Sequence, residues 1–114
     1  MIQSTAFGIM TIDGRTYMSD LILFPDGSVK DGWWRRRGHV LCVDDILALV
    51  DAQPELVVAG TGTNGRMRPK ADLLPFLRER GIEFIAEPNP RAVKTYNDKV
   101  MEGLKVGACF HLTC

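Results

Sequence analysis

The chain has 114 residues and a formal net charge of zero, with 46% hydrophobic and 25% charged residues. This length suits one domain whose core needs no disulfide or metal for stability, and the balanced charge provides no overall attraction to nucleic acid or to an acidic membrane. No apolar segment approaches the roughly 20 residues that cross a bilayer, and the N-terminus lacks the features of a targeting peptide. We therefore expect a single cytoplasmic domain over residues 1–114, with no membrane insertion.

Three segments in the first forty residues have the alternation and turn residues of β-strands. They are FGIMTIDG (7–14), SDLILFPDGSV (19–29) and DGWWRRRGHVL (31–41), and the first two contain the turn signals Asp-Gly and Pro-Asp-Gly. Trp33 and Trp34 in the third segment suit the pleated surface of a strand. The three segments together predict an antiparallel β-meander.

Helices and strands are expected to alternate after residue 41. Asp44 is placed to cap a helix over 45–53, and the apolar segment ELVVAG (55–60) is typical of a strand buried in a parallel sheet. A second helix is predicted over 72–81, with Asp72 as its N-cap and Gly81 at its end. Pro75 takes the third position of this helix, where the missing N–H of proline is harmless. A strand over 82–86 follows.

The last third of the chain predicts one more helix and one more strand. Asn89 is expected to be the N-cap of the helix, with Pro90 at its first position and Gly103 at its end. The apolar stripe of this helix is Ala92, Val93, Tyr96 and Val100. Alternation along the strand KVGACFHLT (105–113) puts Val106, Ala108, Phe110 and Leu112 on one face and Cys109, His111 and Thr113 on the other. The whole pattern predicts an α/β fold, in which an N-terminal β-meander and later β-α units form a mixed central sheet with helices packed on it.

A G-x-G-x-x-G motif follows the predicted strand 55–60, within VVAGTGTNGRMRP (57–69). Glu87 lies where the ribose-binding carboxylate of a dinucleotide site would be expected. In such a site the third glycine lies at the start of a helix, whereas here Pro69 intervenes and the next helix begins only after Asp72. The pyrophosphate would have no helix N-terminus to bind. We therefore expect no cofactor.

Two interpretations of this glycine loop (residues 60–66) remain open. In the first, the glycines only permit a tight turn with positive φ. In the second, the loop lies at the carboxyl edge of the sheet and binds a small anion, in a ligand-binding protein or in an enzyme whose active site is not recognisable. The candidate ligand-binding residues are Gly60, Thr61, Gly62, Thr63, Asn64, Gly65, Arg66, Arg68 and Arg91.

The segment WWRRRGH (33–39) is a candidate interaction surface. Trp33, Trp34 and Arg35 could contact a partner protein, and a homodimer through this predicted strand is an open alternative. Aromatic and basic residues also occur together in nucleic-acid-binding surfaces. On a strand, however, Arg36 would face away from Arg35 and Arg37, and the chain is neutral. Nucleic-acid binding is therefore the lesser alternative, and we expect an unidentified protein partner and no nucleic acid.

The cysteines and histidines form no metal-binding or catalytic motif. Cys109 and His111 share a strand face, but no C-x-x-C pair or second histidine cluster completes a zinc site. Buried cysteines that act as small hydrophobic residues are commoner than catalytic Cys–His pairs. We expect no metal and no catalytic residue, and the roles of Cys109, His111 and Cys114 stay open.

Several segments together resemble one known family. They are GxW…R…GH from residue 32, LVVAGTGTNG (56–65), RGIEF (80–84), AVKTYN (92–97) and VGACFHLTC (106–114). The chain resembles the Mth-type family of domains of unknown function over nearly its whole length, as a member of the bacterial type. The resemblance implies a layered α/β domain with a mixed central sheet.

The same resemblance implies no established reaction. The family includes the adipogenesis-associated Mth-domain protein and assembly factor three of mitochondrial NADH dehydrogenase (complex I), and the mitochondrial members act through protein contacts. With no complete catalytic constellation in this sequence, the leading prediction is a non-enzymatic interaction protein. Its more specific form is an assembly factor for a respiratory oxidoreductase.

Overall fold

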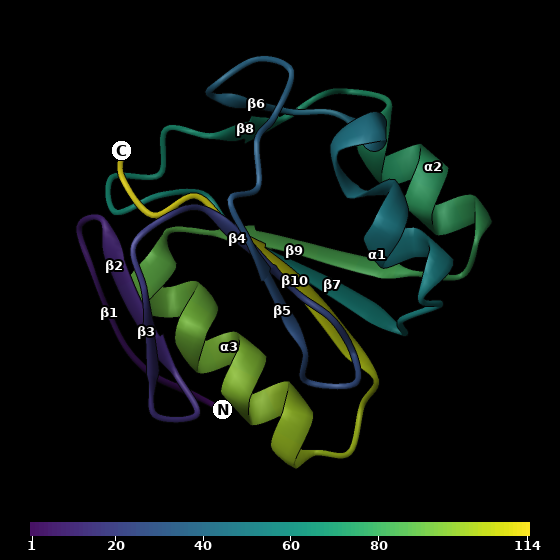
Figure 1. The fold of residues 1–114 in the computed structure, drawn as a ribbon. Coiled ribbons are helices and arrows are strands. Elements are labelled where there is room, and N and C mark those ends of the chain that lie inside the picture. Colours follow the sequence, from purple (N-terminus) through teal and green to yellow (C-terminus); the bar gives the residue numbers. More distant parts are fainter.

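A five-stranded mixed sheet forms the centre of the computed structural model, which describes residues 1–114 (Figure 1). In order across the sheet, the strands are β5 (Val29–Asp31), β4 (Leu21–Leu23), β10 (Val106–Phe110), β7 (Leu56–Gly60) and β9 (Glu83–Glu87). Strands β10, β7 and β9 run parallel, whereas β4 pairs antiparallel with both β10 and β5. The predicted α/β fold with a mixed central sheet is confirmed.

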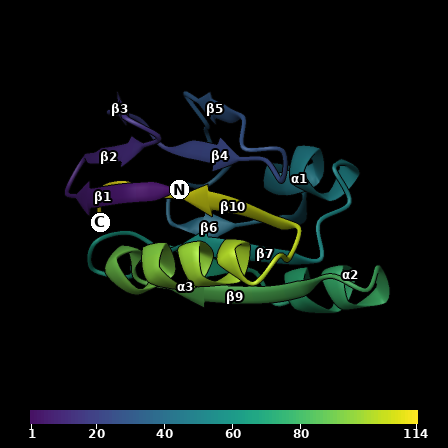
Figure 2. The same ribbon diagram turned by 90° about the horizontal axis from the view of Figure 1, so that it is seen from below.

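One face of the central sheet is covered by helix α3 (Asn89–Met101) and by a small antiparallel sheet, which lie side by side in Figures 1 and 2. The strands of this small sheet are β1 (Ile2–Ala6), β2 (Ile9–Ile12) and β3 (Arg15–Tyr17). An N-terminal β-meander is therefore present, but it consists of β1, β2 and β3. The predicted pairing of residues 7–14 with residues 19–29 is wrong, because residues 9–12 pair with β1 and β3 and not with β4.

The small sheet is held in place by shared apolar packing and by one asparagine. Ile2, Met10 and Ile12 belong to the same buried cluster as Ala92 and Tyr96 of α3. The Asn97 side chain accepts the N–H of Ile2 at 2.9 Å and donates to its carbonyl oxygen at 2.8 Å. Such long-range contacts give β1 a position that local sequence patterns do not specify.

The opposite face of the central sheet is covered by a 3-10 helix at Val43–Ile46, by α1 (Leu47–Asp51) and by α2 (Leu73–Glu79). Ile46, Leu49, Leu73 and Leu77 bury their side chains there in a second apolar cluster. The fold therefore has three layers, and Figure 1 shows the central sheet between α3 with the small sheet on one side and α1 with α2 on the other.

The middle strands β7 and β10 are buried along their whole length because both of their faces are covered. In β10, Val106, Ala108 and Phe110 join the cluster beneath α3, whereas Cys109 joins the cluster beneath α1 and α2. The predicted alternation of β10 is confirmed. Sheets with helices on both faces require such continuous apolar strands.

Local signals placed the second helix correctly and the first one less so. Helix α2 follows Asp72, has Pro75 at its third position, and is closed by Gly81 with φ of 70°. The prediction that Asp44 caps the first helix is wrong, because the carboxylate of Asp45 instead accepts the N–H of Cys42 at 2.8 Å. The helical segment starts two residues earlier than expected, at Val43, as a 3-10 helix.

A two-stranded parallel sheet lies at one edge of the molecule, formed by β6 (Val40–Leu41) and β8 (Arg68–Pro69) (Figure 1). Within the predicted strand 31–41, only Val40 and Leu41 of β6 and Asp31 at the end of β5 belong to a sheet. The prediction of a strand through the tryptophans and arginines is therefore wrong. None of the helices has the length and apolar composition needed to cross a lipid bilayer.

Candidate functional site

The backbone of the glycine loop is already hydrogen-bonded within the chain. The N–H of Thr61 donates to the carbonyl of Glu87 at 2.9 Å, and the N–H of Thr63 donates to that of Thr113 at 2.7 Å. The N–H groups of residues 64 and 66 donate to the carbonyl of Cys114, at 3.3 and 3.1 Å. The C-terminal segment thus fills the position in which a bound anion would meet these donors.

The glycines permit this close approach of the two backbones. A Cβ atom on Gly60 would lie 2.2 Å from the Phe110 ring, and one on Gly62 would lie 2.2 Å from the carbonyl carbon of Cys114. Gly62 and Gly65 also have positive φ, at 106° and 70°, which side chains disfavour. The motif therefore encodes a turn packed against the C-terminal segment.

Asn89 joins the glycine loop to the last strand. Its side chain is buried, accepts the N–H of Gly62 at 3.1 Å and donates to the carbonyl of His111 at 2.7 Å. The prediction that Asn89 caps α3 is wrong, because Pro88 is the N-cap and Asn89 lies inside the first turn. A buried amide that satisfies two backbone groups stabilises the fold more than an exposed cap would.

The side chains proposed as ligand contacts do not gather around a shared cavity. Arg66 and Arg68 are exposed, and the exposed Arg91 guanidinium lies 3.6 Å from the carboxylate of Glu87. None of the five cavities of the molecule is lined by residues 60–66 or by Arg91. The glycine loop stays a predicted ligand site, with neither free N–H donors nor a cavity of its own.

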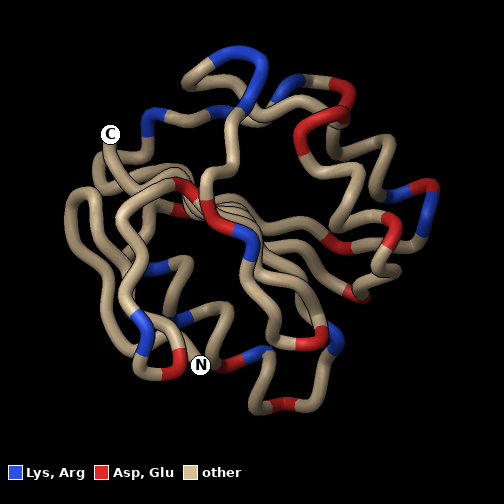
Figure 3. Tube along the Cα trace, viewed as in Figure 1, with Lys and Arg blue, Asp and Glu red and all other residues tan.

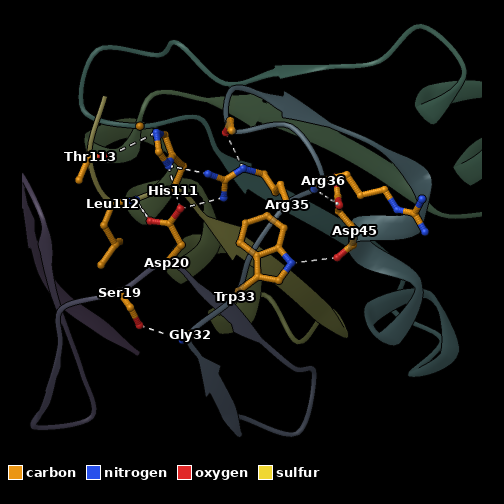
Figure 4. Close-up of polar contacts among 12 residues, drawn as sticks. Ser19, Asp20, Gly32, Trp33, Arg35, Arg36, Asp45, His111, Leu112 and Thr113 are labelled. Carbon is orange, nitrogen blue, oxygen red and sulfur yellow. Dashed lines mark hydrogen bonds and ion pairs between the residues drawn. The ribbon is translucent and has the colours of Figure 1, made fainter.

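The tryptophan and arginine segment forms a loop, which we call the arginine loop (residues 32–39). Its two tryptophans have opposite environments, because Trp33 is 6% exposed and Trp34 is 85% exposed. The indole N–H of Trp33 donates to the carbonyl of Asp45 at 2.9 Å, and the Asp45 carboxylate accepts the N–H of Arg36 at 3.1 Å (Figure 4). The loop is thus anchored to the 3-10 helix through Trp33 and presents Trp34 to solvent.

A buried ion cluster of Asp20, Arg35 and His111 anchors the other side of this loop (Figure 4). The Asp20 carboxylate accepts from the Arg35 guanidinium at 2.8 Å, and its Oδ2 lies 2.8 Å from Nδ1 of His111. The other carboxylate oxygen accepts the N–H of Leu112 at 2.7 Å. Arg35 also donates to the carbonyl of Gly38 at 2.8 Å. The cluster joins three segments that are distant in the sequence.

The environment of Asp20 keeps its carboxylate ionised. Burial disfavours the charge, but hydrogen bonds from His111, Leu112 and Arg35 outweigh this effect and hold the pKa of Asp20 below its usual value of 3.8. In contrast, burial raises the pKa of the Cys109 thiol to about 12, so this cysteine stays a neutral thiol near neutral pH.

The ion cluster has the members of a base-activating pair but not the geometry of an active site. Nε2 of His111 is 3.4 Å from the Thr113 hydroxyl, whereas Nδ1 lies 2.9 Å from Arg35 as well as 2.8 Å from Asp20. Arg35 and His111 thus share Oδ2 of Asp20, the carboxylate oxygen that would orient a catalytic histidine. No cavity of the molecule is lined by these residues, so the arrangement serves to fix the loop.

Arg35 is predicted from the sequence to belong to an interaction surface, but its side chain is only 5% exposed, so it does not lie on that surface. Trp33 is likewise buried and does not belong to an exposed surface. The sequence does not reveal the role of Asp20, since its only local signal is an aspartate placed before an apolar strand. The structure groups no three or more His, Cys, Asp or Glu side chains in a way that could hold a metal ion.

The fold and these clusters define a small three-layer α/β domain with a glycine loop closed by its own C-terminal segment. Residues 2–111 match the family described as Protein of unknown function (DUF498/DUF598), and the chain belongs to this family. The resemblance to the Mth-type domains is thereby confirmed.

Solved structures of similar proteins share the whole fold. The structure of MT938 is 27% identical, with a TM-score of 0.82 over 100% of this chain and 98% of that one. The conserved hypothetical protein PH1505 from Pyrococcus horikoshii OT3 is 21% identical, with a TM-score of 0.84 over 100% of this chain and 99% of its own. A Mth938-like domain from Bordetella pertussis is 16% identical, with a TM-score of 0.66 over 98% of this chain and 85% of that one.

Proposed function

We propose that this chain is a non-enzymatic interaction protein that binds a partner protein through the arginine loop. The observation that carries the proposal is the 85% exposure of Trp34 between two residues, Trp33 and Arg35, whose side chains are buried. Tryptophan and arginine are the residues that most often dominate the affinity of protein interfaces. An exposed tryptophan on a fixed loop is therefore best explained by a partner that covers it.

The rigidity of the arginine loop supports the same proposal. Association has an entropic cost for every side chain and loop that becomes ordered. Here the Trp33 indole, the Arg35 guanidinium and the Asp45 carboxylate already hold the loop backbone before any partner binds. A partner would meet a pre-organised surface.

The state of the nucleophilic and basic groups favours a non-enzymatic role. Cys109 is fully buried, and the Asp20–His111 pair is engaged with Arg35. A nucleophile needs a nearby base and an accessible position for substrate, and neither group offers both.

A more specific form of the proposal is that the partner belongs to the assembly of a respiratory oxidoreductase. Its support is the resemblance to family members that assist the assembly of NADH dehydrogenase. Recovery of subunits of such an enzyme by affinity purification from membranes of the source cells tests this form. Their absence would remove the respiratory role but leave the interaction proposal standing.

Affinity purification with matched variants tests the general proposal. Trp34→Ala removes the exposed indole, and Met101→Ala serves as the control, because Met101 is 78% exposed at the end of α3. We expect one set of proteins to be retained by the wild type and by Met101→Ala and to be lost with Trp34→Ala. Equal retention by both variants would refute a role for the arginine loop.

Ligand binding at the glycine loop, the alternative prediction, has a separate test. Thermal-shift screening with nucleotides, phosphates and carboxylates would detect an anion, and Arg66→Ala would show whether the loop binds it. Stabilisation that depends on Arg66 would support an anion site at this loop. The absence of any stabilising compound would remove that alternative.

A further inference from the structure

Five basic side chains gather where the arginine loop meets the segment after the glycine loop. We call these exposed residues the basic surface: Arg36, Arg37, Arg66, Arg68 and Lys70. Strands β6 and β8 bring the two segments together, since the N–H of residue 68 donates to the carbonyl of His39 at 2.8 Å and that of residue 70 donates to Leu41 at 2.9 Å. Figure 3 shows the basic positions of both segments along one edge of the molecule.

The basic surface is almost unneutralised. Only Arg36 has an acidic partner, the carboxylate of Asp44 at 3.3 Å, and no acidic group pairs with the other four residues. The whole chain has as many acidic as basic residues, so this concentration is local. Gathered like charges repel one another unless an anion approaches them.

A cavity of about 300 Å³ opens in this surface. Its basic lining residues are Arg36, Arg37 and Lys70, and its acidic ones are Asp44 and Asp72. The rest of its lining is aliphatic apart from one cysteine. Because Asp44 and Asp72 lie among the cations, a continuous phosphate backbone would bring some of its charges close to both aspartates. A protein segment can place its carboxylates on the cations alone and an apolar side chain beside the aliphatic lining.

We propose that the basic surface and its cavity bind an acidic segment of the partner protein, with glutamate or aspartate side chains on the cations and an apolar side chain in the cavity. This inference rests on the proposed function, because Trp34 and Arg36 belong to the same loop. It adds the chemistry of the partner, which the exposure of Trp34 alone does not specify.

Binding of a fluorescein-labelled peptide, in which glutamate alternates with leucine and glycine, tests the inference by anisotropy. The double variant Arg37→Glu/Lys70→Glu reverses two exposed charges of the cavity. Lys105→Glu is the control, because Lys105 is exposed immediately before β10 and lies outside this cavity. We expect the double variant to weaken binding by about tenfold or more, and the control to leave it unchanged.

Cys42 provides a second readout inside the cavity. In a Cys114→Ser background it is the one accessible thiol, because Cys109 is buried. Saturating peptide should slow alkylation of Cys42 in the wild-type surface and not in the double variant, and a peptide with glutamine in place of glutamate should have no effect.

Four results would overturn the inference. They are no binding of the acidic peptide, binding that survives the double charge reversal, tighter binding of single-stranded RNA than of the peptide, or displacement of the peptide by inorganic phosphate alone. None of them bears on the loss of partners with Trp34→Ala, so the proposed function can stand while this inference fails.

Discussion

Replacing Arg35 by methionine tests whether the buried ion cluster fixes the arginine loop. The change keeps an unbranched side chain of similar length and removes the guanidinium, which is part of a side chain only 5% exposed and bonds Asp20 and the carbonyl of Gly38. The variant would leave the carboxylate buried without its cation. Removal of one partner from a fully buried ion pair costs about 3–5 kcal/mol, a large part of the roughly 5–15 kcal/mol that stabilises a domain. This range is the upper bound here, because the Asp20 side chain is 16% exposed and keeps its hydrogen bond from the N–H of Leu112.

Arg36→Met is the matched control, one residue along the same loop. Its guanidinium lies 3.3 Å from Asp44, and both side chains are more than half exposed, so this exposed pair contributes no more than about 1 kcal/mol. Urea unfolding followed by circular dichroism at neutral pH gives both free energies. Equal destabilisation by the two substitutions would show that the cluster does not support the fold.

Three further predictions follow from single residues. Asp20 has a lowered pKa, so its stabilising contribution is complete above the unfolded pKa of 3.8 and is lost as the pH falls through the lower folded pKa. The difference in unfolding free energy between wild type and Asp20→Asn should therefore shrink in acid titrations below pH 3.8, and a constant difference would contradict this. Gly62→Ala should lower the free energy of unfolding in urea by about 3 kcal/mol or more, because the φ of Gly62 is 106° and the new Cβ would meet the Cys114 backbone at 2.2 Å. Gly81→Ala, with open space around it, should lower it by about 1 kcal/mol, and similar losses for the two variants would refute the close packing of the glycine loop. Cys42 and Cys114 should react with an aromatic disulfide reagent in the native protein. Cys109 should react only after unfolding, because the Cys109 thiol is buried and its pKa is raised to about 12. Reaction of all three thiols in the folded state would show that the core opens readily.

Local chemistry was sufficient to predict several elements from the sequence. Helix α2 follows an aspartate, has a proline tolerated in its first turn and is closed by a glycine, and each of these residues lies within or beside the helix. The Asp72 side chain makes no capping hydrogen bond, so it marks the start of the helix by its position only. The alternation of side chains along β10 was equally predictable from the sequence, because the two faces of this strand pack into two different apolar clusters. Such signals need no knowledge of the rest of the chain.

The functional surface could not be predicted in the same way, because contacts between distant segments determine it. The tryptophans favour a strand by propensity, yet Arg35 pairs with a carboxylate 15 residues earlier and approaches a histidine 76 residues later, which holds the segment as a loop. Asn89 has the sequence position of a cap, but its side chain serves residues 27 and 22 positions away. Tertiary contacts override local preference at these positions.

Site-specific photocrosslinking most directly tests the claim that the arginine loop is an interaction surface. A photoreactive phenylalanine analogue replaces Trp34 in one sample and the similarly exposed Met101 in another, and both proteins are irradiated in the source cells. We expect a discrete crosslinked species from position 34 that position 101 does not give. If the partner also uses the basic surface, this species should disappear when Arg37 and Lys70 are changed to glutamate. Absence of any crosslink specific to position 34 would show that Trp34 is not covered by a partner protein.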